Sequence, residues 1–303
     1  MNALLLPTFS ANSTGISPVA CYTVVLNEKL SMQGQTIFIT GASRGIGRAI
    51  ALNCAKLGAN VIIAAKSAEP HPKLPGTIHS VAKEVEAAGG QALAIQLDVR
   101  DEVAVVKAVE QAVDHFGGLD AMINNASAIA LTNLQSTDVK RFDLIHSINT
   151  RGTLVCSQAA IPHLKQSKNP HIITLSPPLN LAKHWLKPFI PYTLSKYGMT
   201  LLTLGMAEEL REDGISACTL WPQTAIATAA VQYALDAKLM SQSRTPAIMA
   251  DAAQVILEAE NQQFSGESWV DEGLLRSQGV TDFEAYKHDP SAKELARDLY
   301  LDQ

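Results

Sequence analysis

The stretch TIFITGASRGIG, residues Thr36–Gly47, decides the fold of this chain. Its apolar, β-branched first half predicts a buried strand. The glycines at Gly41, Gly45 and Gly47 allow a tight turn that brings the backbone close to a ligand, and Arg48–Leu57 has a helical pattern. The segment therefore predicts a strand, a turn and a helix in succession.

The turn is a candidate dinucleotide site. A helix N-terminus offers unpaired N–H groups and the positive end of the helix dipole to a pyrophosphate. The spacing is G-x-x-x-G-x-G and no Lys-Ser or Lys-Thr pair follows, which disfavours a triphosphate loop. The alternative is a tight turn without a ligand. The predicted cradle consists of Gly41, Ala42, Ser43, Arg44, Gly45, Ile46 and Gly47.

Composition limits the class of protein and of partner. The chain has 303 residues, 47% of them hydrophobic and 17% charged, so one α/β domain with a large core accommodates it. Its net charge is −5 and no cluster of Lys and Arg occurs, which argues against nucleic acid or an anionic membrane as partner. A small-molecule partner is expected.

The cysteines and the N-terminus bear on location. Cys21, Cys54, Cys156 and Cys218 show no paired spacing, so we expect reduced core residues in a cytoplasmic protein. No apolar run approaches the ~20 residues that span a bilayer, so no stable membrane insertion is expected. Residues 1–27 have no charged side chain and lack secretory or mitochondrial features. We expect residues 1–30 to be a disordered extension, with Met32 as the functional start.

Strands alternate with helices along the rest of the chain. Further strands are predicted at Ala59–Ala65, Ala92–Leu97, Leu119–Ile123, His171–Leu175, Ile215–Leu220 and Glu267–Val270. Helices are predicted at Ile78–Ala88, Arg100–Phe116, Phe142–Ala160, Pro191–Leu210, Ala225–Met240 and Met249–Glu260. This alternation indicates parallel βαβ units whose strands end at one crevice. The glycine turn, Asp98, Asn125 and Ser176 all lie at such ends.

The second strand bears on cofactor choice. It ends at Lys66, with no acid about 20 residues beyond the glycines to hold ribose hydroxyls. A basic residue there suits a 2′-phosphate, and Arg44 adds a second cation, so NADP is favoured over NAD. The alternative is that Lys66 is a solvated strand end. Asp98 either bonds the adenine amino group or caps the next helix.

Tyr192 and Lys196 form the predicted catalytic pair. They lie four residues apart, hence on one face of a helix. A nearby cation lowers the pKa of a phenol, so Tyr192 could exchange a proton with a carbonyl or hydroxyl oxygen. Ser176 could donate a hydrogen bond to that oxygen, and Asn149 could bend its helix and hold a relay water. Each residue alone also has an ordinary structural explanation.

The chain resembles the short-chain dehydrogenase/reductase family in a set of motifs and in their order. They are TGASRGIG, Asp98-Val99, NNAS, Asn149, Ser176 and YTLSK. The resemblance covers about residues 32–272. It implies one Rossmann-type doubly wound parallel sheet with helices on both faces, in an NADP-binding domain over residues 31–303. It also implies homo-oligomers paired through the helices that hold Asn149 and Tyr192.

The resemblance assigns roles to particular residues. The implied catalytic residues are Asn149, Ser176, Tyr192 and Lys196. The implied cofactor contacts are Gly41–Gly47, Lys66, Asp98, Val99, Asn125, Ala126, Tyr192, Lys196 and Thr224. Two departures bear on them, because Ser127 replaces the family's usual glycine of NNAG and Gln223 replaces the glycine of Pro-Gly. The altered turn leaves open whether Thr224 or Thr228 reaches the carboxamide.

The substrate is expected to be apolar. Residues 177–190 and 225–240 should wall the pocket, and Trp185, Leu186 and Phe189 make the first wall suited to a fatty or steroid-like substrate. These side chains could equally pack on the helix of Tyr192. An NADPH-binding sensor without significant catalysis is the alternative function. A hydrolase or metal site has little support, because no histidines have ligand spacing and no G-x-S-x-G occurs.

Overall fold

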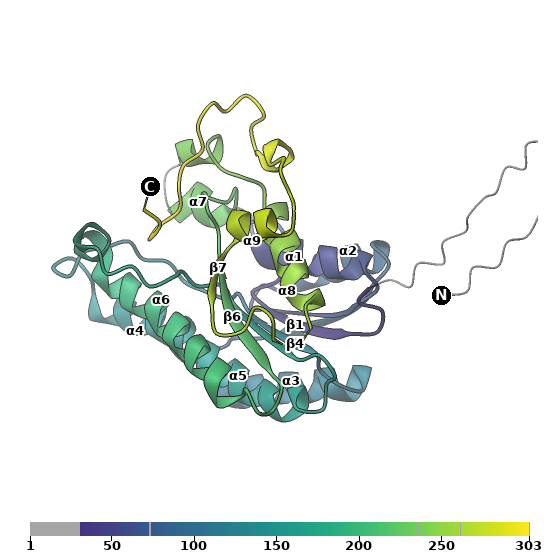
Figure 1. Cartoon of the computed structure of the whole chain (residues 1–303). Helices are drawn as coiled ribbons and strands as arrows, with labels where there is room; N and C mark the ends of the chain where they lie inside the picture. The colour runs from purple at the N-terminus through teal and green to yellow at the C-terminus, as the bar shows by residue number, and fades with distance from the viewer. Residues whose placement is uncertain (1–30, 73, 235–236, 261, 303) are drawn as a thin grey trace, which may run out of the picture.

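The computed structural model describes residues 31–72, 74–234, 237–260 and 262–302 (Figure 1). The extension predicted for residues 1–30 lies outside them. Seven parallel strands form one sheet in the order β3-β2-β1-β4-β5-β6-β7. The strands are β1 Thr36–Thr40, β2 Asn60–Ala65, β3 Gln91–Gln96, β4 Ala121–Asn124, β5 His171–Thr174, β6 Ser216–Trp221 and β7 Ser268–Val270. The predicted doubly wound sheet is confirmed.

Helices cover both faces of this sheet (Figure 1). They are α1 Gly45–Lys56, α2 Ile78–Ala87, α3 Glu102–Phe116, α4 Val139–Ile148, α5 Thr150–Leu164, α6 Lys183–Glu209, α7 Ala229–Ala234, α8 Ala247–Glu258 and α9 Asp271–Ser277. Short 3-10 turns occur at Ala237–Met240 and Glu284–Tyr286. Within the described residues, no helix is long and apolar enough to cross a bilayer.

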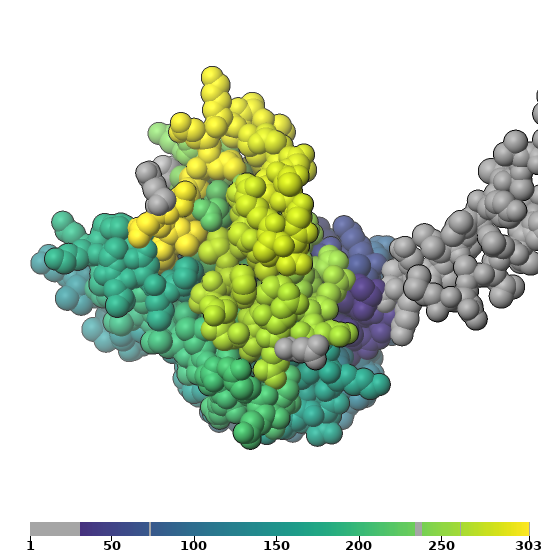
Figure 2. All heavy atoms as spheres, viewed as in Figure 1, coloured from purple at the N-terminus to yellow at the C-terminus, as the bar shows by residue number. Residues whose placement is uncertain are grey.

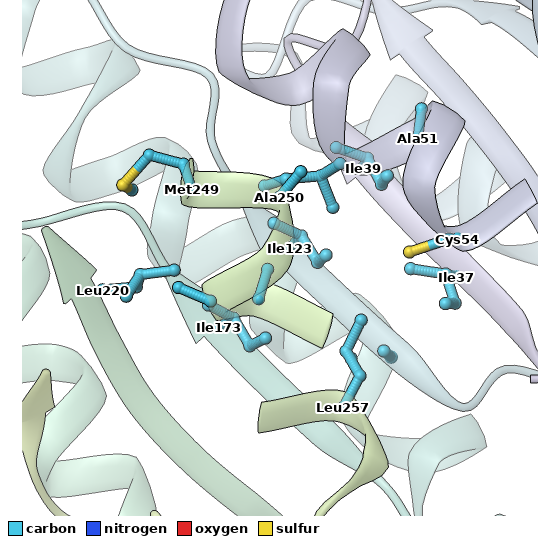
Figure 3. Packing of buried hydrophobic residues seen from close by; sticks show 14 of the residues in the cluster. Ile37, Ile39, Ala51, Cys54, Ile123, Ile173, Leu220, Met249, Ala250 and Leu257 are labelled. Atoms are coloured by element: carbon cyan, nitrogen blue, oxygen red, sulfur yellow. The ribbon is translucent and has the colours of Figure 1, made fainter. Parts of the chain in front are cut away.

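The core has two layers because successive strand side chains point to opposite faces. Ile37 and Ile39 of β1 pack against α1 and α8, as Figure 3 shows, whereas Phe38 packs on the face covered by α3, α5 and α6. Both faces of β1 are therefore buried, which explains its uninterrupted apolar sequence. Cys54 and Cys218 are buried in these layers as free thiols, as predicted, and Cys21 lies outside the described residues.

Three helices differ from the predictions. The single helix expected over Phe142–Ala160 is two helices, α4 and α5, that meet at Asn149. Helix α6 begins before Pro191, at Lys183, and is kinked at Phe189, whose φ is −154° and ψ is 47°. The helix expected from Ala225 begins only at Ala229. Residues 225–227 are extended there because they exchange backbone hydrogen bonds with Arg244 and Ala296.

The last residues of the chain return to the sheet. We call residues 296–302 the C-terminal segment; it belongs to the yellow part of the chain in Figure 2. The backbone N–H of Ala225 donates to the Ala296 carbonyl at 2.8 Å, and that of Asp298 donates to the Gln223 carbonyl at 3.2 Å. The segment therefore lies along the loop that leaves β6, at the carboxyl edge of the sheet.

Candidate active site

A cavity of about 690 Å³ lies at the carboxyl ends of β1 to β4. Its size falls in the range of small-molecule and cofactor sites. Among the predicted cofactor residues, its lining contains Gly41, Ser43, Arg44, Gly45, Ile46, Lys66, Asp98, Val99, Asn125 and Ala126. Ser127, Thr228 and Tyr233 also line it. The structure thus brings the glycine turn and three further strand ends to one cavity.

The glycine turn has the geometry that its sequence demands. Gly41 and Gly45 have φ values of 69° and 58°, in the left-handed region that favours glycine. A Cβ atom on Gly47 would lie 2.5 Å from Nδ2 of Asn125 and 2.8 Å from the Gly41 carbonyl oxygen. Helix α1 starts at Gly45, directly at the cavity. The turn therefore directs the N-terminus of α1 and its N–H groups toward a ligand.

Asn125 holds this turn in place. Its Nδ2 donates to the carbonyl oxygens of Thr40 at 2.8 Å and Gly41 at 3.1 Å. Its backbone N–H, and that of Ala126, donate to the Thr40 hydroxyl at 3.0 Å. The end of β4 is thereby tied to the end of β1, so the amide of Asn125 supports the cavity wall.

Lys66 and Asp98 form an ion pair at one end of the cavity. Lys66 Nζ lies 3.3 Å from Asp98 Oδ2, and the Arg100 guanidinium binds the same carboxylate at 2.5 Å. Arg100 in particular, helped by Lys66, holds the pKa of the Asp98 carboxyl well below its usual range. The cap of α3 is Asp101, which accepts from the Ala104 N–H at 3.0 Å. Of the two roles considered for Asp98, the helix cap is therefore wrong.

Arg44 fastens a neighbouring loop to the turn. Its guanidinium donates to the carbonyl oxygens of Pro75 and Gly76, each at 3.0 Å, and burial lowers its pKa. A Cβ on Gly76 would lie 2.3 Å from the Ser43 carbonyl oxygen, so the loop packs tightly on the turn. Arg44 and Lys66 both line the cavity.

Helix α6 carries the predicted catalytic side chains to the end of β5. Lys196 is 2% exposed, and its Nζ donates to the Leu175 carbonyl oxygen at 2.6 Å. Ser176, which follows Leu175, is fully buried, and its hydroxyl lies 3.0 Å from that of Thr200, which donates to the Pro177 carbonyl oxygen at 2.7 Å. Tyr192, one turn before Lys196, is 4% exposed. The end of β5 thus meets the face of α6 that carries Lys196 and Thr200.

Asn149 lies at the predicted bend, between α4 and α5. Its Nδ2 donates to the Ala128 carbonyl at 3.0 Å and to the Ser195 hydroxyl at 2.9 Å, and its Oδ1 accepts from the Ala128 N–H at 2.8 Å. Both amide hydrogens are therefore used within the protein. The side chain connects the loop after β4 to α6.

The protonation of the pair differs from the sequence prediction. Burial raises the pKa of Tyr192 above its usual value, and Tyr300 and Asp298 add to this rise. Burial also lowers the pKa of Lys196 to about 7, against an opposing effect of Asp298. The sequence predicted a lowered tyrosine pKa. Removal of water dominates, because it disfavours both the phenolate and the ammonium.

The two candidate threonines are placed differently. Thr228 lines the cavity, and its Cγ2 would lie 3.4 Å from a Cβ on Gly45. Thr224 is buried and pairs with Arg297 of the C-terminal segment. Its hydroxyl has no partner among the described residues. The structure therefore places Thr228, and not Thr224, on the cavity wall.

A second cavity, of about 410 Å³, lies between the loop after β5 and the C-terminal segment. Its lining is Pro178, Leu179, Asn180, Leu181, Gln223, Arg297, Tyr300, Leu301 and Asp302. Trp185 and Phe189 belong to α6, the helix of Tyr192, and pack against Tyr300 of the C-terminal segment, which differs from both alternatives considered for these side chains. Sequence reasoning missed Asp298 and Tyr300. The aromatic and leucine residues of the DLYLD stretch were the available signal.

Comparison with known proteins agrees with this architecture. The family model described as short chain dehydrogenase matches residues 35–238. Hydroxysteroid dehydrogenase-like protein 2 from Danio rerio is 53% identical over 271 residues, which cover 89% of this chain and 65% of that protein. The human protein of that name is 50% identical, over 90% of this chain and 64% of its own length. The chain thus spans less than two thirds of these relatives.

Solved structures match as well. A putative dehydrogenase from Xanthomonas campestris is 50% identical, with a TM-score of 0.87 over 90% of this chain and 99% of that one. A short chain dehydrogenase from Mycobacterium paratuberculosis bound to NAD is 25% identical, with a TM-score of 0.67 over 82% and 99%. A metagenomic short-chain oxidoreductase in complex with NADP is 27% identical, with a TM-score of 0.66 over 79% and 97%.

The close approach at Gly47 gives a direct test of the turn. We expect Gly47→Ala to weaken dinucleotide binding and to destabilise the ligand-free protein by about 1–3 kcal/mol, because the new methyl group overlaps Asn125 and Gly41. Gly273→Ala in α9 is the control, since its Cβ meets nothing within 4 Å. Urea denaturation and NADPH fluorescence titration measure the two effects. Equal behaviour of the two variants would contradict the proposed role of the turn.

Proposed function

Because this chain belongs to the short-chain dehydrogenase/reductase family, we propose that it interconverts a carbonyl and an alcohol by NADP-dependent hydride transfer. The observation that carries the proposal is the contact of Lys196 and Thr200 of α6 with Leu175 and Ser176 where β5 ends, at the carboxyl edge of the sheet that also holds the cofactor-sized cavity. Tyr192 lies one turn before Lys196 on the same helix. The proposed unit is a single domain over residues 31–303.

The cavity residues fit a dinucleotide. The glycine turn packs so closely that a Cβ on Gly47 would overlap Asn125 and Gly41, and Gly41 and Gly45 line the cavity. The N-terminus of α1 beside the turn suits a pyrophosphate. In the proposed complex Asp98 and Val99 lie at the adenine, Asn125 and Ala126 border the central part, and Thr228 takes the carboxamide contact first expected of Thr224. Lys196 and Tyr192 lie toward the nicotinamide ribose.

The phosphorylated cofactor is favoured by two cations. Lys66 is 62% exposed at its side chain and pairs with one carboxylate, so it can turn toward a 2′-phosphate. Arg44 is fixed by two carbonyl oxygens beside the same end. One related structure contains NAD and another contains NADP, so the shared fold does not distinguish the two cofactors. The preference for NADP is therefore supported by Arg44 and Lys66.

The protein's own groups perform the proton chemistry. The bound cofactor supplies or takes up the hydride. The Thr200 hydroxyl lies 2.7 Å from the Pro177 carbonyl oxygen, to which it donates, and 3.0 Å from the Ser176 hydroxyl. In the proposed complex the Ser176 hydroxyl hydrogen turns to the substrate oxygen and polarises it. Tyr192 then gives its proton to that oxygen in reduction, or accepts it in oxidation. The Lys196 ammonium stabilises the resulting phenolate, and Asn149 holds the loop after β4 and α6 in register.

The substrate proposal is an apolar alcohol or carbonyl of fatty or steroid-like type. Leu179, Leu181 and Leu301 at the second cavity support it. The name of the relatives, hydroxysteroid dehydrogenase-like protein 2, is consistent with a steroid-like substrate. The cytoplasmic location is part of the proposal and is supported by the buried free thiols of Cys54, Cys156 and Cys218.

A second candidate is an NADPH-binding sensor with little catalysis. The near-complete burial of Tyr192 and its raised pKa favour it, because a proton donor must be accessible to its substrate. NADPH oxidation assayed with fatty aldehydes, ketosteroids and quinones separates the two. Tight NADPH binding with no turnover on any of these compounds would favour the sensor.

Replacing Tyr192 by Phe tests the acid/base role. The variant keeps the ring but lacks the hydroxyl, so turnover should fall by about 10²–10⁴-fold while NADPH binding changes little. Steady-state oxidation of NADPH and fluorescence titration give the two quantities. Retained turnover would refute the assignment of Tyr192.

Lys66→Ala tests the cofactor preference. Loss of a charged contact to the 2′-phosphate should raise the Kd of NADPH by about 10- to 100-fold and leave that of NADH nearly unchanged. Lys168→Ala, at an exposed lysine before β5, is the matched control. Equal weakening of both cofactors by Lys66→Ala would count against a 2′-phosphate contact.

We also propose that the chain forms homo-oligomers through α5 and α6. Leu154 on α5 and Leu194 and Leu201 on α6 are large apolar side chains that remain exposed. Leu201→Glu should dissociate the assembly in sedimentation velocity because it places a charge in this face. Leu134→Glu, in the exposed loop after β4, should not. An assembly unaffected by Leu201→Glu would argue for another interface.

A further inference from the structure

The Asp98 carboxylate, just beyond the end of β3, binds two cations in different ways. The Arg100 guanidinium reaches both carboxylate oxygens, with Nε 3.0 Å from each of them and Nη2 2.5 Å from Oδ2. The backbone N–H of Arg100 also donates to Oδ1 at 3.1 Å. Lys66 approaches the same carboxylate at one atom, with Nζ 3.3 Å from Oδ2. Arg100 is therefore the main partner of Asp98.

Arg100 is held in this position from the start of α3. Its carbonyl oxygen accepts a hydrogen bond from Nη1 of Arg151 at 2.9 Å, and Nη2 of Arg151 pairs with Glu102 at 3.0 Å. A guanidinium that binds both oxygens of a carboxylate is held more firmly and more directionally than an ammonium at a single oxygen. The pair of Arg100 and Asp98 is therefore the fixed part of this cluster.

Lys66 is the exchangeable part. Its side chain is 62% exposed, against 39% for that of Arg100. Its main chain is anchored, because its carbonyl oxygen accepts from Nε2 of Gln96 at 3.3 Å. Lys66 and Asp98 line the cavity, and within the described part of the chain Arg100 does not belong to that lining. A flexible lysine can change its partner at little cost, so a ligand in the cavity can take Lys66 from Asp98 while Arg100 stays.

We propose that Arg100 is a specificity-determining residue for the phosphorylated cofactor, because it neutralises Asp98 when Lys66 leaves that carboxylate for the 2′-phosphate. The inference rests on the proposed function, in which Lys66 contacts this phosphate. Without Arg100, the departure of Lys66 leaves an unneutralised carboxylate beside the phosphate, and the like charges repel each other. NADH has no 2′-phosphate and does not draw Lys66 away, so its binding depends little on Arg100.

The same exchange suits the adenine of the cofactor. A carboxylate has about four lone-pair sites, and Arg100 occupies sites on both oxygens of Asp98. Departure of Lys66 from Oδ2 leaves an acceptor for the adenine amino group, which is the contact proposed for Asp98. Arg100 thus lets one carboxylate exchange a cation for a neutral donor without being left as an isolated negative charge.

Replacing Arg100 by Met in the full chain tests this inference. The variant keeps an unbranched stem without charge, so the ratio of the Kd of NADH to the Kd of NADPH should fall by about 3- to 10-fold, mainly through weaker NADPH binding. The fall should be larger at about 0.01 M than at about 1 M ionic strength, because salt screens exposed charges. Arg100→Lys retains the charge and should keep most of the preference. Fluorescence titration measures each Kd.

Two controls separate charge repulsion from a loss of structure. Arg211→Met removes an exposed arginine that pairs with Glu208, just beyond α6, and should leave the ratio unchanged. In the Asp98→Asn background there is no carboxylate to neutralise, so adding Arg100→Met should change the ratio by less than about twofold. Equal weakening of both cofactors by Arg100→Met, or the same fall of the ratio in both backgrounds, would overturn the proposal.

A titration without cofactor tests the pairing by itself. Arg100 is the first cause of the lowered pKa of Asp98, and Lys66 contributes less. NMR of protein labelled with ¹³C at aspartate carboxyl groups should therefore show a larger rise of this pKa in Arg100→Met than in Lys66→Ala, and the reverse order would overturn the proposal. A wild-type protein that binds neither NADPH nor NADH would refute the proposed function and with it the cofactor role of Arg100. NADPH binding with an unmoved ratio in Arg100→Met would refute the role of Arg100 alone.

Discussion

The arrangement depends on a lysine that is buried where water is scarce. Lys196 is brought against the end of β5 by α6 and is nearly fully buried. A pKa lowered from 10.5 to about 7 corresponds to a cost of about 5 kcal/mol for charging it in the folded protein. Because the folded pKa is depressed, this cost is borne below pH 7 and diminishes as the pH rises from 7 toward 10.5.

Three surrounding features can be understood from this constraint. The Leu175 carbonyl accepts a hydrogen bond from the Lys196 ammonium and directly precedes Ser176, so one hydrogen bond sets the relative position of lysine and serine. Trp221 supplies an aromatic face. Asn149, through Ser195, fixes the turn of α6 just before Lys196. Each contact restricts where Lys196 can go without adding a negative charge.

The sequence predicted what depends on local pattern. The strand, the turn and the start of the helix around Gly41 and Gly47 are encoded within twelve residues. Tyr192 and Lys196 lie four residues apart, so they share one face of their helix however that helix packs. The position of Ser176 at the edge that holds the glycine turn followed from parallel strands ending at one edge. The sequence pattern could not tell that Asp98 is the ion-pair partner and Asp101 the helix cap, because both are acidic residues near the start of the same helix.

What could not be predicted involves contacts between distant residues. Residues 225–227 resemble the start of a helix, but backbone pairing with Ala296 and Arg244 keeps them extended. The protonation of Tyr192 depends on burial and on Asp298 and Tyr300, more than a hundred residues away. One consequence concerns synthesis: Leu299, whose carbonyl accepts a hydrogen bond from the Trp221 indole, follows Trp221 by 78 residues, which takes roughly 4–16 s at ribosomal rates of about 5–20 residues per second. A nascent chain can therefore assemble most of its sheet seconds before it can complete the surroundings of the buried Lys196.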